Sequence, residues 1–203
     1  MRAPRTVMAV AVAAGVLGAA GCGSSGAGAG SGGGSAGAAA NPAAPEVNPA
    51  GDIPDNQAYV PYTPAGAPFS VKVPEGWSRR STGAAVTFTD KLNSIRIESA
   101  RTGGTLTPAA ARRTEVPALA RSVKGFRLGK ITTVHRKAGT AVEVTYLSEA
   151  APNSVTGKAG TDAVERYVFA HNGSQVVLTL SGPKGADNVD PWRIVTDSLK
   201  WTR

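Results

Sequence analysis

The sequence is poor in the residues that build covalent or metal-linked frameworks. It contains one cysteine, Cys22, so no disulfide can close within the chain. With only two histidines beside it, His135 and His171, a zinc site of three or four His and Cys ligands is not expected, and we expect neither a metal nor another cofactor. No run of 18 or more strongly apolar residues is present, so the sequence predicts no transmembrane helix.

Residues 1–21 have the layout of a secretory signal peptide. A short positive region precedes an apolar run, Thr6 to Leu17, that is too short to span a bilayer. The residues Ala19-Ala-Gly-Cys22 that follow resemble the bacterial lipobox, although Ala19 stands where leucine is most common. The resemblance implies that the Cys22 thiol receives diacylglycerol and becomes the new N-terminus, and two acyl chains are about what stable membrane anchoring requires. The alternative is an ordinary signal peptide cleaved near Ala20, with Cys22 a bystander.

Residues 22–67 have the composition of a tether. Gly, Ser and Ala dominate its first part and Pro and Ala its second, and large hydrophobic side chains are nearly absent before Ile53. Such a chain buries too little apolar surface to offset the entropy of ordering it, so we expect a disordered linker. Its last part carries Ile53, Tyr59, Val60 and Tyr62, which either dock on the protein's own surface or form a recognition motif for a partner.

Residues 68–203 are predicted to form one globular α+β domain. Apolar and polar residues alternate in seven segments, which indicates strands with one buried face. Thr107-Pro108 and Asp190-Pro191 each combine a capping residue with a proline before a helical pattern, and Pro117 is expected to kink or split the first helix. The order β-β-β-α-β-β-β-β-α favours an antiparallel sheet of about seven strands sandwiched with helices. The expected strands lie at 69–73, 86–89, 95–98, 126–135, 142–146, 164–170 and 175–180, and the expected core includes Trp77, Val86, Ile97, Val144, Leu178 and Trp192.

The segment Phe69-Ser-Val-Lys-Val-Pro-Glu-Gly-Trp77 resembles the F-x-V-x-V-P-x-G-W opening of PsbP-like domains. Relatives of that family include the LpqN-like lipoproteins of high-GC Gram-positive bacteria and a Ran-binding nuclear import factor. The closing Ser198-Leu-Lys-Trp201 also resembles the end of that fold, and the resemblance spans residues 68–203, mostly as element order. It implies a PsbP-like fold and carries no catalytic residues. Because members mostly bind other proteins or stabilise assemblies, it implies a binding module and not an enzyme.

Catalytic patterns are weak. A Ser/His/Asp triad would need His135, which lies among cations, or His171, which lies beside the Asn172-Gly173 turn, and no Gly-x-Ser-x-Gly elbow is present. Thr156-Gly-Lys158 lacks the upstream glycine of a phosphate-binding loop. We therefore expect no enzymatic activity. An envelope hydrolase with an unrecognised active site is the alternative, and a structural subunit of a larger envelope complex is a third possibility.

The charge is strongly positive. The full chain carries a formal net charge of +8, and residues 68–203 contain 20 Lys and Arg against 11 Asp and Glu. An exported protein does not normally meet nucleic acid, so the expected partners are the membrane, through the lipid anchor, and an acidic protein or an anionic envelope polymer. Arg113, Arg121 and Lys124 fall within about 80° of one another on the first predicted helix and are the candidate contacts, unless this is only a solvated face. The sequence thus predicts a lipoprotein on the extracytoplasmic face of the cell membrane that binds without catalysis.

Overall fold

The computed structural model describes residues 50–101, 104–152, 157 and 159–202. The chain divides into two compact units, residues 1–44 and 45–203, and all described residues belong to the second. The predicted signal peptide, Cys22, Thr156 and Lys158 therefore lie outside the described residues. In the part that is described, no helix is long and apolar enough to cross a membrane.

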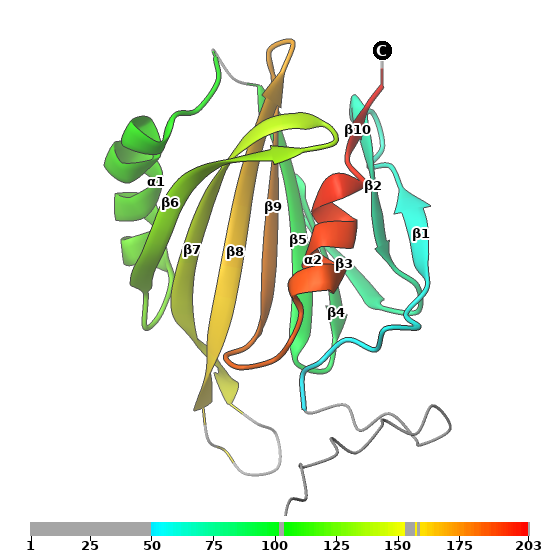
Figure 1. Ribbon diagram of the computed structural model, residues 1–203, viewed down its shortest axis with the longest axis vertical. Helices are drawn as coiled ribbons and strands as arrows, with labels where there is room; N and C mark the ends of the chain where they lie inside the picture. The colour runs from blue at the N-terminus through cyan, green and yellow to red at the C-terminus, as the bar shows by residue number, and fades with distance from the viewer. Residues whose placement is uncertain (1–49, 102–103, 153–156, 158, 203) are drawn as a thin grey trace, which may run out of the picture. The chain divides into compact units, whose positions relative to one another are not determined.

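A seven-stranded antiparallel sheet forms the centre of the domain (Figure 1). Its strands follow in the order β3-β4-β5-β9-β8-β7-β6, which confirms the predicted fold class. Asn172 and Gly173 have positive φ angles of 45° and 73° and form the tight turn between β8 and β9, because this turn type needs left-handed backbone at both positions. The strands are β3 (Ser78–Thr82), β4 (Ala85–Asp90), β5 (Asn93–Arg101), β6 (Arg127–Arg136), β7 (Gly139–Pro152), β8 (Ala159–His171) and β9 (Ser174–Pro183).

The larger core lies between one face of this sheet and a second layer. That layer consists of the helix α2 and a three-stranded sheet of order β1-β2-β10 (Figure 1). Phe69, Val71 and Val73 alternate inward from β2 and are nearly inaccessible to solvent, as the alternation in this segment predicts. The elements of the layer are β1 (Tyr59–Tyr62), β2 (Phe69–Pro74), α2 (Val189–Asp197) and β10 (Lys200–Trp201).

The smaller core lies under helix α1 (Pro108–Ser122), on the opposite face of the sheet. Ala111 and Leu119 are the buried residues of α1, and they pack in one cluster with side chains of β7 and β8. Thr107 Oγ1 accepts the backbone N–H of Ala110 at 3.1 Å, so the predicted N-cap is confirmed. The helix runs through Pro117 as a single element and is not split there.

Three strands have no counterpart in the sequence prediction. All five residues of β3 are exposed, so this edge strand shows no alternation of apolar and polar residues. β10 contains only two residues, and β1 lies in the segment whose proline content indicated a tether. The N-cap of α2 is also different, because the helix begins at Val189 after Asn188 and not after Asp190.

The segment before Pro68 belongs to the fold. Ile53 is 4 % exposed, and its backbone N–H donates to Asn188 Oδ1 at 2.9 Å. β1 pairs in antiparallel register with β2, and Tyr59 and Tyr62 pack against the larger core. The described residues from 50 to 67 therefore belong to the folded part, ahead of the boundary at Pro68 that composition indicated. Of the two readings of this segment, docking on the protein's own surface is the one that the contacts show.

Four of the six expected core residues are buried, namely Ile97, Val144, Leu178 and Trp192. Trp77 and Val86 are only half-buried and pack at the margin of the larger core. Trp77 lies in the turn between β2 and β3, and Val86 lies where the covering layer ends, so neither is enclosed on all sides.

Candidate functional site

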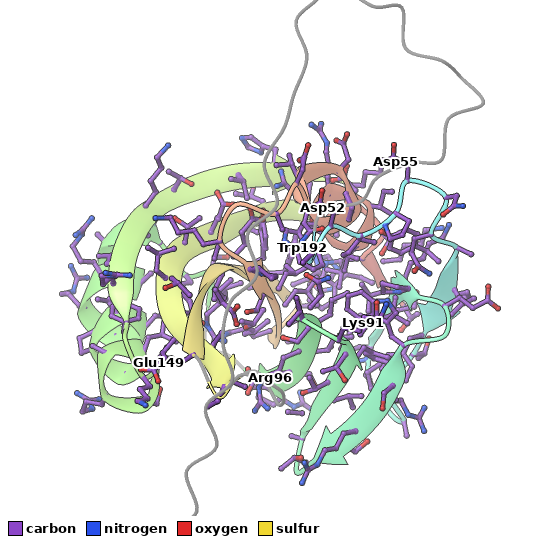
Figure 2. The ribbon with its side chains drawn as sticks, turned by 90° about the horizontal axis from the view of Figure 1, so that it is seen from below. Asp52, Asp55, Lys91, Arg96, Glu149 and Trp192 are labelled. Carbon is purple, nitrogen blue, oxygen red and sulfur yellow. The ribbon has the colours of Figure 1, made fainter. Side chains whose placement is uncertain are left out.

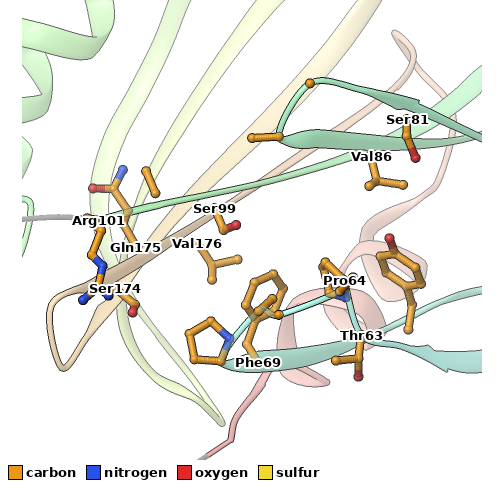
Figure 3. Close-up of a pocket in the computed structure, with 18 of the residues that line it drawn as sticks. Thr63, Pro64, Phe69, Ser81, Val86, Ser99, Arg101, Ser174, Gln175 and Val176 are labelled. Carbon is orange, nitrogen blue, oxygen red and sulfur yellow. The ribbon is translucent and has the colours of Figure 1, made fainter.

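A cleft of about 980 Å³ opens where the seven-stranded sheet extends past the layer that covers it (Figure 3). Its floor is the face of the sheet that carries the larger core, continued toward solvent by β3, β4, β5 and β9. The connection between β1 and β2, residues 63–68, forms part of the lining, together with Phe69. The cleft exists because β5 and β9 are 9 and 10 residues long, whereas β2, which covers them, has 6.

Strand alternation places polar side chains on the floor of the cleft. Ile95 and Ile97 point from β5 into the core and are almost fully buried. Ser99 and Arg101 follow at the same period of two, so they lie on the same face but beyond the cover. Figure 3 shows Arg101 at one end of the cleft and Ser81 of β3 at the other.

A second arginine lines the opposite end of the cleft. Arg79 of β3 lies over the ring of Tyr62, with its guanidinium carbon 5.8 Å from the ring centroid. Tyr62 is held in turn by an edge-to-face contact with Phe88 at a centroid distance of 5.0 Å. The face of an aromatic ring attracts a cation, so this arrangement positions the guanidinium at the cleft without neutralising it.

The lining of the cleft includes Arg79 and Arg101 and contains no Asp or Glu. Neither arginine forms a salt bridge with an acidic side chain among the described residues. A second hollow of about 550 Å³, beside α2, carries Lys72, Lys137 and Lys200 but also two carboxylates, Asp190 and Asp197. Of these two hollows, the cleft is therefore the one in which arginines attract an anion and no carboxylate repels it.

The absence of acidic residues extends over the whole end of the domain that holds the cleft. We call this the turn end, because the connections at 63–68, 83–84, 137–138 and 172–173 meet there (Figure 1). The chain segments that reach it contain no Asp or Glu: 62–69, 82–85, 99–101, 104–108, 134–142, 169–177 and 198–202. They contain Arg101, Arg136, Lys137 and Lys200.

The opposite end, which we call the loop end, holds many of the acidic residues. The connections at 50–58, 75–77, 91–92, 123–126 and 184–188 meet there. Figure 2 views the molecule from this side and shows Asp52 and Asp55. The acidic residues of these connections and of the adjoining strand and helix ends are Asp52, Asp55, Glu75, Asp90, Glu149, Asp162, Asp187 and Asp190. The same connections also carry Lys91, Lys124 and Lys184, so the loop end has charges of both signs, whereas the segments at the turn end have cations and no carboxylates. The described chain enters the domain at the loop end.

The predicted contacts Arg113, Arg121 and Lys124 lie on α1 and directly after it, and all three are exposed. Lys124 Nζ is 2.6 Å from Glu149 Oε1, so its charge already has a partner. Arg113 and Arg121 have no acidic partner among the described residues. Arg112, which is also exposed, has none either, so the helix offers three arginines without an acidic partner on the face of the sheet opposite to the cleft.

Neither histidine is built into a catalytic arrangement. His135 is exposed, and its Nδ1 lies 3.3 Å from Thr140 Oγ1. His171 is exposed and stacks on Trp201, with the ring centroids 5.3 Å apart. Within the described ranges, no three His, Cys, Asp or Glu side chains are grouped as metal ligands.

A carboxyl pair with one shared partner lies on β7 and β8, on the same face of the sheet as the larger core. Tyr167 Oη is 2.8 Å from Glu143 Oε1 and 2.7 Å from Glu165 Oε2, and it accepts a hydrogen bond from Arg136 Nη2 at 3.0 Å. A phenol has one hydrogen, so it can donate to only one carboxylate, and the second short contact requires a proton on a carboxyl group. Burial raises the pKa of Glu165, and the nearby Glu143 raises it further.

The carboxyl pair is connected to α2 through Arg136, which hydrogen-bonds to the shared Tyr167. Arg136 also donates from Nε to Thr196 Oγ1 of α2 at 3.0 Å, and the same Nε lies 4.0 Å from Asp197 Oδ1. Tyr167 itself is 2 % exposed. Burial in this arrangement accounts for the raised pKa of Glu165.

Sequence reasoning missed Arg79, Ser81, Ser99 and Arg101. One signal was available, because the alternation Ile95, Ile97, Ser99, Arg101 shows a buried face that turns polar before the strand ends. Arg79 and Ser81 gave no such signal, since their strand is exposed throughout and is recognised only through its pairing with β4.

No family model matches the chain, and no similar protein of known annotation was found. Among solved structures, the chain is similar to the cyanobacterial PsbP protein CyanoP of Synechocystis, with 14 % identity, a TM-score of 0.50, and coverage of 71 % of this chain and 93 % of that one. This likeness confirms the PsbP-like fold that the Phe69–Trp77 motif indicated.

Other matches are weaker in TM-score. They include LpqN of Mycobacterium tuberculosis, described as involved in cell envelope biogenesis, with 18 % identity, a TM-score of 0.43 and coverage of 73 % and 93 % of the two chains. The Ran-binding protein Mog1p of Saccharomyces cerevisiae matches with 11 % identity, a TM-score of 0.46 and coverage of 71 % and 96 %. The chain spans 46 % of a further matching structure, from Bacteroides thetaiotaomicron.

Proposed function

We propose that this chain is a lipid-anchored extracytoplasmic protein whose basic domain binds an anionic component of the cell envelope and catalyses no reaction. The observation that carries the proposal is the polarised charge of the domain. The segments that meet at the turn end contain no Asp or Glu, and they contain Arg101, Lys137 and Lys200. A surface with cations and no carboxylates attracts anions over about 8–10 Å at physiological ionic strength.

The lipid anchor is the second part of the proposal. Cys22 follows Ala19-Ala-Gly21, and it is the sole cysteine of the sequence. An unpaired cysteine is unusual in an exported protein, and acylation at this position would account for the presence of Cys22. An anchored domain searches a small volume, which raises its effective concentration near envelope polymers.

The proposal is tested by binding measurements in a salt series. The chain from residue 22, carrying Cys22→Ala so that it stays soluble, is applied to immobilised anionic and neutral polymers. We expect binding to the anionic polymers alone, weakened strongly by about 0.5 M salt, because the screening length falls to about 3 Å by 1 M. Equal binding to neutral polymers, or binding that salt leaves unchanged, would contradict the proposal.

The same assay separates binding from catalysis. A binding protein returns the polymer at its original length after prolonged incubation. Progressive shortening of the polymer would instead identify an envelope hydrolase, the alternative that the sequence left open.

A further inference from the structure

We infer that the cleft at the turn end binds a hydroxyl-rich polyanionic chain, such as a polyol phosphate or a uronate-containing glycan, with Arg79 and Arg101 as its two ionic contacts. This inference rests on the proposed function and adds to it the site and the chemical class of the ligand. It also moves the principal contact from α1, where the sequence placed it, to the opposite face of the sheet.

The spacing of the two arginines favours a ligand with several anionic groups. In the sheet register, Arg79 lies opposite Phe88, and Phe88 lies opposite Ile95. Arg101 is six residues beyond Ile95 along β5, which is about 20 Å at the rise of a strand. One phosphate or carboxylate is too small to occupy both ends of such a cleft, whereas a charged chain laid along it reaches both.

The side chains between the arginines suit a ligand rich in hydroxyl groups. Ser81, Ser99 and Ser174 supply hydroxyls that both donate and accept hydrogen bonds. Figure 3 shows Ser174 beside Arg101. An acyl chain would lose these partners without replacing them, because burying an unpaired polar group costs free energy.

Three of the four strands that form the floor of the cleft cannot take up an acidic peptide by strand addition. β4, β5 and β9 are inner strands, and each pairs with a neighbour on both sides. Their backbone N–H and C=O groups are therefore already used, so a peptide could add only to the edge strand β3. The polar side chains of the floor are serine hydroxyls and two guanidinium groups, and they stand beside apolar side chains such as Phe69, Val86 and Val176.

The shape of the site disfavours a membrane surface. The two arginines line a hollow of about 980 Å³ and do not stand on a protruding face. A planar layer of headgroups cannot reach the floor of a cleft, whereas a single flexible polymer chain can.

The test compares three variants that each lose two positive charges. R79Q/R101Q removes the two ionic contacts of the cleft. R80Q/K91Q is the matched control, because Arg80 is exposed next to Arg79 on the other side of β3 and Lys91 is exposed in the turn at the loop end. R113Q/R121Q removes two of the three arginines of α1 that have no acidic partner among the described residues, and it leaves Lys124 with its partner Glu149 in place. All six positions are exposed, so the variants should fold, and a thermal melt of each verifies this.

The soluble chain with Cys22→Ala and its three variants are titrated with polyglycerol phosphate, polygalacturonate, dextran, polyglutamate and phosphatidylglycerol vesicles. We expect at least one of the first two probes to bind, and R79Q/R101Q to weaken that binding about tenfold or more, as loss of charge-assisted hydrogen bonds does. R80Q/K91Q should bind within about twofold of the parent, because its charges are remote and screened. Which of the two probes responds distinguishes a phosphate from a carboxylate ligand.

Other results would overturn the inference in different ways. If R79Q/R101Q binds like the parent while R113Q/R121Q does not, the contact is on α1 and the proposed function stands without the cleft. If polyglutamate or the vesicles depend on the cleft arginines as strongly as the hydroxyl-rich polymers do, the ligand class is wrong. If no anionic probe binds the parent, the proposed function fails together with the inference.

Discussion

Replacing Ile53 with alanine should destabilise the domain substantially, although this residue lies in a segment with the composition of a linker. Ile53 is 4 % exposed and belongs to the larger core together with Trp192. Ile→Ala replacements at buried sites cost about 2–5 kcal/mol, because the lost transfer free energy is joined by the cost of the cavity. We expect a loss of about 2–4 kcal/mol in the free energy of unfolding. The backbone N–H that donates to Asn188 is retained in this variant, so the value reports the side chain alone.

The matched control for this variant is Val60→Ala. Val60 lies in the same segment but is 36 % exposed, so its truncation should change stability by about 0.5 kcal/mol or less. Urea unfolding followed by tryptophan fluorescence gives both values on the soluble chain with Cys22→Ala. For a domain of this size, the Ile53 variant should also melt roughly 8–15 °C lower.

The pair of variants decides where the folded domain begins. If Ile53→Ala unfolds within about 0.5 kcal/mol of the parent, the segment before Pro68 is not part of the cooperative unit, and the burial argument fails. If the expected difference is found, a soluble fragment that starts at Pro68 lacks part of the core and should not be used for binding assays.

Three further predictions address the anchor, the core and the carboxyl pair. Cys22→Ala should release the chain from the membrane fraction or leave an unprocessed precursor, and a variant that stays membrane-bound and is cleaved at the same place would refute acylation. Trp192→Ala should cost about 3–5 kcal/mol in urea unfolding, whereas Trp77→Ala should cost clearly less, since Trp192 is buried and Trp77 is half-buried; equal losses would contradict this placement. Burial raises the pKa of Glu165 above its ordinary value of 4.5. Ionisation of this carboxyl group therefore destabilises the folded state as the pH rises through the raised pKa, whereas below pH 4.5 the group is protonated in both the folded and the unfolded state and costs no stability. The stability of Glu165→Gln relative to the parent should therefore increase from pH 4.5 to 8, and a difference that does not change with pH would contradict this.

The sequence predicts the inner strands of this fold and the edge strand β6, but it misses the edge strands β1, β3 and β10, for a physical reason. Inner strands such as β5 and β9 bury one face, so apolar residues recur at every second position and the pattern is visible. β3 has no buried residue and is stabilised by pairing with β4, so nothing in its composition marks it as a strand. β1 depends on long-range contacts with β2, and its prolines favour an extended chain whether or not a partner strand is present.

The candidate site was harder to predict, because it depends on where strands end in space. Arg79 and Arg101 are 22 positions apart in the sequence and come to one cleft through two antiparallel pairings. Net charge predicted that the domain is basic, but the absence of carboxylates from the turn end follows from which connections meet at that end. The helical spacing of Arg113 and Arg121 was visible in the sequence for the opposite reason, since a helix face is a local property of the chain.

Charge and chain direction together separate the proposed binding surface from the point where the described chain begins. That chain starts at residue 50, at the loop end, where Asp52 and Asp55 lie (Figures 1 and 2), whereas the cleft lies among the connections of the turn end. The loop end carries charges of both signs, since Lys91, Lys124 and Lys184 accompany its carboxylates, whereas the segments at the turn end carry cations and no carboxylates. A polyanion is therefore attracted to the turn end over about 8–10 Å at physiological salt and meets no comparable excess of positive charge at the loop end. On the proposal that Cys22 is acylated, the described chain joins the domain at the end that does not hold the proposed site, so a ligand can reach the cleft from the side opposite to residue 50.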